Sequence, residues 1–253
     1  MNSPTQPQVP AVAAPGEQLW EQHASWWIDG FTNGADPEYR DQIIPLALDL
    51  LANRRHVLDV GTGEGQIARE LCARGATVVG LDPTAAQLRV AAQRGGGPQY
   101  LAGQADAVAT RSAAFDAALA CLVFEHVSDL QAGLNEVFRV LAPGGRFVWM
   151  LNHPLLQCPG SGWIIDVDLD ERYWRVGPYL ESQHVVEEVT KGVFIPFVHR
   201  PISTSINALL QAGFVLDQVL EPAPPSSYLE QSPELAEQAS IPRLLVLSAS
   251  KPT

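Results

Sequence analysis

The chain has 253 residues, of which 46% are hydrophobic and 17% are charged. This composition predicts one large folded domain and excludes a mostly disordered chain, and no apolar run reaches the roughly 20 residues of a membrane-spanning helix. The 16 basic and 28 acidic residues leave a net charge of −12, which repels nucleic-acid phosphates and anionic lipid surfaces. We therefore expect neither a nucleic acid nor a membrane as a partner.

Cysteine usage and the first residues of the chain predict a cytoplasmic protein. Cys72, Cys121 and Cys158 are widely spaced and form no CxxC pair, a pattern typical of reduced thiols rather than of disulfides or a zinc site. Residues 1–16 contain four prolines and no lysine or arginine, so they lack the features of a signal or transit peptide. We predict that they form a disordered tail.

From residue 56 onward, short β-rich runs alternate with amphipathic helical patterns. The predicted strands cover 56–60, 77–82, 99–102, 115–121 and 146–151. The predicted helices cover 66–74, 84–94 and a segment that begins after Asp129 and ends at Pro143. This alternation predicts right-handed βαβ units and a mostly parallel sheet that helices cover on both faces.

The segments before and after this region do not follow the same alternation of strands and helices. Residues 17–35 hold Trp20, Trp26 and Trp27 on a predicted short helix, before a second helix start at Asp36-Pro37. Residues 153–200 show no clean periodicity. The regular pattern then resumes with a predicted helix at 204–211 and strands at 214–220 and 243–249.

The glycine-rich loop LDVGTGEG (58–65) is the most informative stretch, and Asp82 ends the following strand. In an open α/β sheet, ligands bind outside the carboxyl ends of the strands, where glycines let the backbone approach them. An acidic residue at the end of the second strand can accept hydrogen bonds from two ribose hydroxyls. The GxGxG spacing and the carboxylate of Asp59 disfavour a dinucleotide pyrophosphate. They suit a ligand with an ammonium group and a ribose, although an ordinary tight turn is the simpler alternative.

Four segments, in order, resemble the class I S-adenosylmethionine-dependent methyltransferases, specifically their small-molecule branch called type 11. These segments are VLDVGTGEG, VVGLDPT, FDAALACLVFEHVSD and LAPGGRFVWMLNHP, within residues 57–154. The resemblance implies a doubly wound α/β fold, with a mostly parallel, seven-stranded Rossmann-like sheet and an antiparallel last strand. It implies an enzyme that uses S-adenosyl-L-methionine to methylate an oxygen or nitrogen of a small metabolite, quinone or lipid-like acceptor, as a monomer or homodimer.

The resemblance also implies which residues hold the cofactor. The glycine loop would bind its methionine portion, and Asp82 its ribose hydroxyls. Gln104 and Ala105 stand where the family usually has Asp-Ala, and the Gln104 amide oxygen can still accept from the adenine amino group. Apolar packing is the alternative role of the residues at the end of the fourth strand. The expected cofactor-binding residues are Asp59, Gly61, Thr62, Gly63, Gly65, Asp82, Pro83, Leu88, Gln104, Ala105, Cys121 and Leu122.

Two histidines are the candidates for catalysis. Methyl transfer requires a positioned acceptor and the exclusion of water, and a general base only where the acceptor carries a proton. His126 follows the fourth strand and His153 the fifth, so both are expected at the rim of the cleft, with a structural role as the alternative. No metal is expected, because no spacing of His, Asp or Glu is typical of a metal site.

Aromatic residues outside the regular core are expected to line the acceptor site. In this family the acceptor pocket is commonly built from an amino-terminal lid, here 17–35, and an insertion after the fifth strand, here 153–200 of the methyltransferase domain 36–253. Packing onto the sheet is the alternative. The expected substrate-binding residues are Trp27, Trp163, Tyr173, Trp174 and His199.

Three other functions stay open from the sequence. An NAD(P)-dependent oxidoreductase is disfavoured by the missing GxGxxG and by Asp59. A protein or nucleobase methyltransferase is disfavoured because Leu122–Glu125 stands where an Asn/Asp-Pro-Pro-Tyr motif would be. A non-catalytic regulator would bind S-adenosylmethionine but turn over no acceptor.

Overall fold

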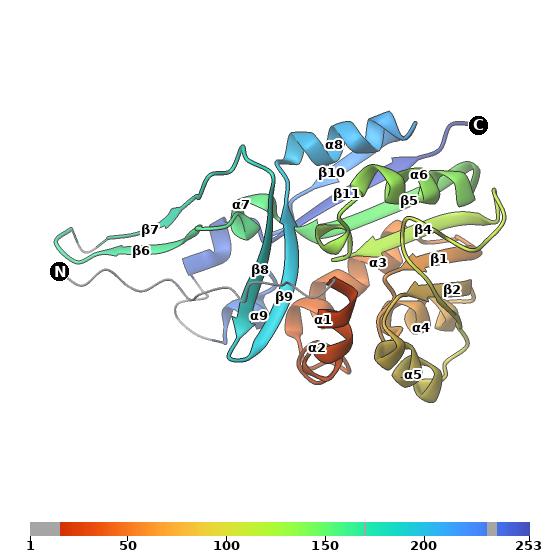
Figure 1. Ribbon diagram of the computed structural model, residues 1–253, viewed down its shortest axis with the longest axis horizontal. Helices are drawn as coiled ribbons and strands as arrows, with labels where there is room; N and C mark the ends of the chain where they lie inside the picture. Colours follow the sequence, from red (N-terminus) through yellow and green to blue (C-terminus); the bar gives the residue numbers. More distant parts are fainter. Residues whose placement is uncertain (1–15, 170, 232–236) are drawn as a thin grey trace.

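A computed structural model describes residues 16–169, 171–231 and 237–253. Its centre is a seven-stranded sheet in the order β10-β11-β5-β4-β1-β2-β3 (Figure 1). The strands are β1 (His56–Val60), β2 (Thr77–Asp82), β3 (Gln99–Ala102), β4 (Phe115–Cys121), β5 (Leu141–Asn152), β10 (Val215–Leu220) and β11 (Leu244–Ser250). The first five strands pair in parallel, and β11 is antiparallel to both β5 and β10. The predicted doubly wound sheet with an antiparallel last strand is confirmed.

Helices cover both faces of the sheet, and each face has its own hydrophobic core. α6 (Leu130–Val140) and α8 (Ile202–Gln211) pack on one face, and α3 (Ile44–Leu50) and α4 (Gln66–Ala73) on the other. α5 (Ala85–Arg94) lies against β2 and β3. β1 is buried from Val57 to Val60, as expected of a parallel strand that is covered on both sides.

The strand order places a crevice at the carboxyl end of β1. β2 and β3 lie on one side of β1, and β4 and β5 lie on the other, so the chain changes direction there. Loops after neighbouring strands diverge at such a point and leave room for a ligand. The glycine loop joins β1 to α4 at this position, and Asp129 caps α6 after β4 by accepting from the Ala132 N–H at 2.9 Å.

β5 differs from the prediction at its start. It begins at Leu141 instead of Arg146, because the predicted Pro-Gly-Gly break pairs with the segment after β11. Gly144 N–H donates to the Lys251 carbonyl, and Lys251 N–H donates to the Gly145 carbonyl, both at 2.9 Å. The register with β4 shifts there to accommodate the extra residues.

The insertion after β5 contains regular structure that its sequence pattern did not reveal. It comprises α7 (Pro154–Gln157) and two hairpins, β6 (Gly162–Asp166) with β7 (Glu171–Arg175), and β8 (Gln183–Thr190) with β9 (Val193–His199). The β6–β7 hairpin projects away from the sheet, whereas β8–β9 stands beside α1 (Figure 1). No residue of β6 or β7 is fully buried, so neither strand needs the alternation that marks a half-buried strand.

The amino-terminal segment forms two helices where the sequence predicted one. These are α1 (Gly16–Gln22) and α2 (Ala24–Phe31), and they are followed by a π-helical turn, η1 (Tyr39–Ile43), that runs into α3. The tail predicted at 1–16 lies outside the described residues except for Gly16. The remaining short elements are η2 (Phe124–His126), α9 (Ser226–Leu229) and η3 (Glu237–Ser240). Within the described ranges, no helix has the length and apolarity needed to cross a membrane.

Candidate functional site

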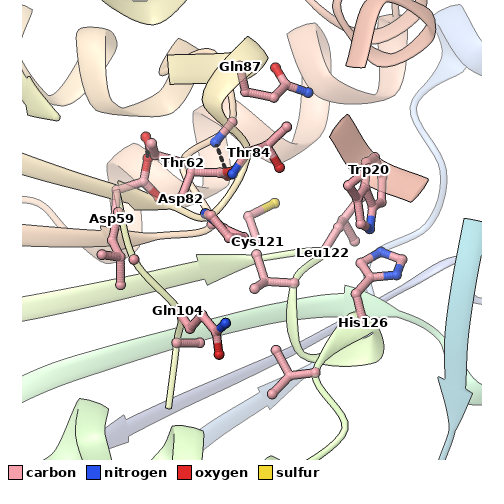
Figure 2. A pocket seen from close by; sticks show the side chains of 18 of the residues that line it. Trp20, Asp59, Thr62, Asp82, Thr84, Gln87, Gln104, Cys121, Leu122 and His126 are labelled. Atoms are coloured by element: carbon pink, nitrogen blue, oxygen red, sulfur yellow. Dashed lines mark hydrogen bonds between the residues drawn. The ribbon is translucent and has the colours of Figure 1, made fainter. Parts of the chain in front are cut away.

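A cavity of about 350 Å³ opens at the carboxyl ends of β1, β2 and β4 (Figure 2). The loops after these strands and after β3 form most of its wall, and the amino-terminal part of the chain adds Trp20 of α1, Trp27 of α2 and Tyr39 of η1. Most residues expected to bind a cofactor line this cavity: Asp59, Gly61, Thr62, Gly63, Asp82, Pro83, Gln104, Ala105, Cys121 and Leu122. The cavity thus lies at the crevice that the strand order creates.

Two of the expected residues, Gly65 and Leu88, do not line the cavity. Gly65 has a φ of +82° and directly precedes α4, and a Cβ there would collide with the Tyr100 hydroxyl. Leu88 is in α5 and is absent from the residues that line the cavity. Gly65 therefore serves the turn into the helix, since its left-handed conformation and the close side chain both require a missing Cβ.

The two glycines of the loop that line the cavity shape it in different ways. Gly61 has a φ of +68°, and a Cβ on it would collide with Val123. Gly63 has a φ of +57°, and a Cβ on it would lie 3.8 Å from both Trp27 Nε1 and Gln87 Oε1, where it would fill part of the cavity. Glycine at position 63 therefore keeps open the space between the loop and α2.

Asp59 is a buried carboxyl group at the floor of the cavity. Its Oδ2 accepts a hydrogen bond from the Thr62 hydroxyl at 2.7 Å. Burial raises the pKa of Asp59 to about 7, and the neighbouring carboxylates Asp82 and Glu64 add to the increase. A cation placed beside this group would offset the cost of its buried charge. The floor of the cavity is therefore suited to a ligand's ammonium group.

Asp82 ends β2 and is held in place by two backbone groups. Its Oδ2 accepts from Gly63 N–H and its Oδ1 from Thr84 N–H, both at 2.8 Å. Burial also raises the pKa of Asp82. The Thr84 side chain also hydrogen-bonds to this carboxylate, which keeps further acceptor capacity for a ligand hydroxyl. Nearby, Gln87 Oε1 is buried and has no hydrogen-bond partner among the described residues, so it is a further acceptor at this wall.

His126 lines the cavity from the side opposite the glycine loop. Its Nδ1 lies 2.7 Å from the Pro196 carbonyl of β9, so Nδ1 carries the proton and donates it, which leaves the lone pair on Nε2. Burial lowers the pKa of His126 to about 4, and the ring is therefore neutral at pH 7. Its ring lies beside that of Trp20 (Figure 2), with the centroids 4.9 Å apart, and its centroid is 4.7 Å from that of Phe197.

The structure does not bring His153 into this site. The side chain is fully buried, and its Nε2 donates to Glu221 Oε1 at 2.8 Å. Its Nδ1 accepts from Leu155 N–H at 3.2 Å and so caps α7. Because both ring nitrogens are engaged and the residue is absent from the cavity wall, its geometry supports a structural role.

Of the aromatic wall expected for an acceptor, only Trp27 reaches the cavity, where it is joined by Trp20. Trp163 and Trp174 pack edge to face on the β6–β7 hairpin with their centroids 5.5 Å apart. Tyr173 is half-exposed on the same hairpin. His199 is buried elsewhere, with its Nε2 2.8 Å from the Tyr179 carbonyl.

Several lining residues were missed by sequence reasoning. Thr84 and Gln87 lie within about one helical turn of the predicted ribose-binding Asp82, so their spacing could have identified them. Tyr39, in contrast, comes from the π-helical turn and has its hydroxyl 3.8 Å from Cys121 Sγ, a contact that no local pattern indicates. The other residues missed on the wall include Glu64, Gln66, Asp106 and Asp129.

The cavity wall carries charge of one sign. Among the described residues that line it, none is a lysine or an arginine, and the acidic ones are Asp59, Glu64, Asp82, Asp106 and Asp129. No group of three or more His, Cys, Asp or Glu in the described part of the chain is arranged to hold a metal ion. The wall therefore favours neutral or cationic ligands.

A family model and a solved structure both match this chain to methyltransferases. Residues 58–149 match a family model described as a methyltransferase domain. The crystal structure of an S-adenosylmethionine-dependent methyltransferase from Mesorhizobium loti superposes with a TM-score of 0.73 at 30% identity and covers 83% of this chain and 96% of that one.

Two curated proteins match over shorter regions. A demethylmenaquinone methyltransferase of Thermus thermophilus is 38% identical over 121 residues, which are 46% of this chain and 54% of that protein. A ubiquinone biosynthesis O-methyltransferase of Methylobacterium nodulans is 38% identical over 112 residues, or 43% of each chain. The chain thus spans about half the length of these two relatives.

Proposed function

Because this chain belongs to the S-adenosylmethionine-dependent methyltransferases, we propose that it methylates an oxygen or nitrogen atom of a small-molecule acceptor. The observation that carries this proposal is the buried Asp59 carboxyl group, which lies at the floor of the cavity without a lysine or arginine among the lining residues. Asp82 stands nearby as an acceptor for hydroxyl groups.

The residues of the cavity fit S-adenosylmethionine. The Asp59 carboxylate would hold its amino group, and the remaining lone pairs of Asp82 would accept from its ribose hydroxyls. Gln87 Oε1 is a buried acceptor on the same wall. The open space over Gly63, which a Cβ would fill, gives the ligand room to approach the backbone.

The chain's own groups would position the acceptor and exclude water. Bound S-adenosylmethionine supplies an activated methyl group on a positively charged sulfur. Trp20 and Trp27 cover the cavity, and orientation of the acceptor within it can supply roughly 7–11 kcal/mol of the barrier. His126 Nε2 carries a lone pair and would accept the proton of the acceptor hydroxyl or amine as it reacts.

The wall also limits the class of acceptor. The acidic lining and the absence of lysine and arginine among its described residues disfavour phosphorylated or carboxylated acceptors. The indole rings of Trp20 and Trp27 suit a flat, apolar or cationic molecule. The names of the two curated relatives, which refer to menaquinone and ubiquinone, support a quinone-like ring as one such acceptor.

Calorimetric titration tests the proposed donor, and a radiolabelled-methyl assay tests the transfer. S-adenosylhomocysteine is expected to bind with micromolar or tighter affinity and NADH not at all. In the assay, a panel of neutral phenols, quinols and amines is expected to contain acceptors, while their carboxylated analogues react poorly. Tight NADH binding without S-adenosylhomocysteine binding would contradict the proposal, and donor binding without any transfer would indicate a non-catalytic regulator.

The affinity for the donor is expected to depend on pH through Asp59. Its pKa of about 7 means that the carboxyl group is mostly protonated below pH 7 and must lose that proton to pair with an ammonium group. Affinity should therefore fall by up to about tenfold per pH unit below pH 7 and level off above it. Titrations at pH 6 in two buffers of different ionisation enthalpy should reveal proton release, and a pH-independent affinity between pH 5.5 and 8 would contradict this role.

A further inference from the structure

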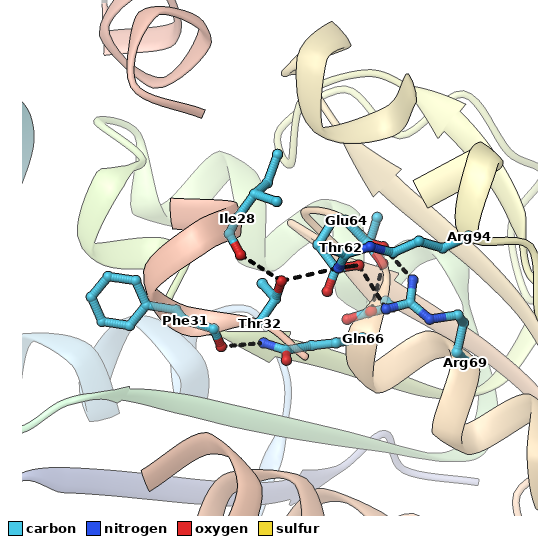
Figure 3. Close-up of polar contacts among 9 residues, drawn as sticks. Ile28, Phe31, Thr32, Thr62, Glu64, Gln66, Arg69 and Arg94 are labelled. Carbon is cyan, nitrogen blue, oxygen red and sulfur yellow. Dashed lines mark hydrogen bonds and ion pairs between the residues drawn. The ribbon is translucent and has the colours of Figure 1, made fainter. Parts of the chain in front are cut away.

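A buried ionic cluster lies directly behind the glycine loop (Figure 3). At its centre is the side chain of Glu64, which is 1% exposed. Arg69 of α4 pairs with Glu64 Oε2 at 2.6 Å, and Arg94 at the end of α5 pairs with the same oxygen. A buried carboxylate between two guanidinium groups holds its position firmly, since leaving any of these charges unpaired is costly.

The same cluster reaches the end of α2. Arg94 Nη1 also donates to Thr32 Oγ1 at 3.0 Å, and the Thr32 hydroxyl donates to the Ile28 carbonyl at 2.7 Å (Figure 3). Gln66 of α4 adds a longer contact, from its Nε2 to the Phe31 carbonyl at 3.4 Å. Thr32 is 2% exposed, so this attachment is shielded from water.

The attached helix carries a wall of the cavity. Trp27 stacks on Phe31, with centroids 4.5 Å apart and an interplanar angle of 15°. Its indole N–H approaches the space over Gly63, the residue next to Glu64. The cluster therefore holds both sides of the gap between the glycine loop and α2. Glu64 belongs to the loop and Trp27 to the helix, and the side chain of Arg94 joins the two by contacting Glu64 and the end of α2.

The other end of the α1–α2 segment is joined to α5 by more exposed groups. Glu21 pairs with Arg89 at 3.5 Å and accepts from Ala86 N–H at 3.1 Å, but the side chains of Glu21 and Arg89 are 42% and 72% exposed. Exposed ion pairs of this kind contribute about 0–1 kcal/mol. Ala86 and Arg94 are at opposite ends of α5, so one helix carries a weak attachment at its start and a buried one at its end.

We propose that Thr32 and Arg94 are positioning residues for the methyl donor. They fix the carboxyl end of α2 against the glycine loop, so that Trp27 closes the cavity over Gly63. The role toward the donor rests on the proposed function, but the attachment itself does not and can be measured without a ligand.

A matched pair of substitutions tests the attachment. Thr32→Val keeps the shape of the side chain but removes the hydroxyl, whereas Thr32→Ser keeps the hydroxyl. Hydrogen–deuterium exchange of the ligand-free protein should show about tenfold faster exchange of the amides of residues 24–32 in Thr32→Val and wild-type exchange in Thr32→Ser. If exchange is the same in both variants, the attachment is not what holds α2.

Titration with S-adenosylhomocysteine tests the consequence for binding. Thr32→Val and Arg94→Met are expected to weaken its binding about tenfold and to raise the KM for the donor more than they lower kcat, while Thr32→Ser binds like the wild type. Arg94→Met leaves Glu64 paired with Arg69. As a control at the exposed end, Glu21→Gln should change affinity less than about twofold. Equal affinity of Thr32→Val and the wild type would overturn the proposal, whereas a wild type that binds no S-adenosylhomocysteine would overturn the proposed function instead.

Discussion

Replacing Asp59 with asparagine is expected to weaken binding of S-adenosylhomocysteine by about 10²-fold or more and, at the same time, to stabilise the ligand-free protein. The loss of affinity follows because the variant can no longer pair with the ligand's ammonium group, and removal of one partner of a buried charge pair costs about 2–5 kcal/mol. The Thr62 hydroxyl can still donate to the amide oxygen of the variant, so the loop keeps this contact.

The gain in stability has a separate cause. The pKa of Asp59 is raised from 3.8 to about 7 in the folded protein, so ionisation at pH 8 opposes folding by up to about 4 kcal/mol. This penalty is absent below pH 4, grows between about pH 4 and 7, levels off above pH 7, and disappears in Asp59→Asn. Thermal denaturation at pH 8 should therefore show a higher Tm for the ligand-free variant.

A control variant separates the local effect from the change in net charge. Asp106 also lines the cavity but is exposed, so Asp106→Asn should leave both the Tm and the affinity close to wild type. An Asp59→Asn protein that binds S-adenosylhomocysteine normally would show that Asp59 is not the group that receives the ligand's ammonium. A lower Tm of the ligand-free variant at pH 8 would instead contradict the cost assigned to ionising Asp59.

Replacing His126 with phenylalanine is expected to lower kcat by about 10²–10⁴-fold, while the affinity for S-adenosylhomocysteine stays within about threefold of wild type. Phenylalanine keeps the ring between Trp20 and Phe197 but removes the Nε2 lone pair. His126→Gln offers an amide oxygen that can orient the acceptor but is a much weaker base. The activity that His126→Gln retains would therefore measure how much of the rate comes from orienting the acceptor rather than from accepting its proton.

Two controls test this assignment: the dependence of the wild-type kcat on pH, and a substitution of His153. With a pKa of about 4, His126 is deprotonated at all pH values above 5, so it should impose no change in kcat between pH 6 and 8. His153→Gln should lower the Tm through loss of the Glu221 contact without lowering the kcat of the folded enzyme. Equal losses of kcat in the His126 and His153 variants would contradict the assignment of His126 as the proton acceptor.

The sheet and the part of the cavity wall formed by the loops after its strands could be predicted from the sequence because both depend on local patterns. A parallel strand covered on both faces must be a short apolar run, and β1, β2 and β4 all have this form. Once their order is known, their carboxyl ends must meet, and this brings Asp59, Asp82 and Leu122 to one cavity.

The acceptor side could not be predicted in the same way, because its residues depend on distant partners. His126 and His153 both follow strands, and what separates them is Pro196 for the first and Glu221 for the second, each about 70 residues away in the chain. Trp163 and Trp174 are residue types that often line a binding pocket, but here they pack on each other within one hairpin. No local sequence pattern determines where that hairpin lies relative to the cavity.

The partner of the His126 ring is a main-chain oxygen, and this has a consequence for how the family can diversify. Any amino acid at position 196 presents the same carbonyl, provided that the path of β9 is kept. Side chains along the β8–β9 hairpin can therefore vary without altering which imidazole nitrogen of His126 holds the proton.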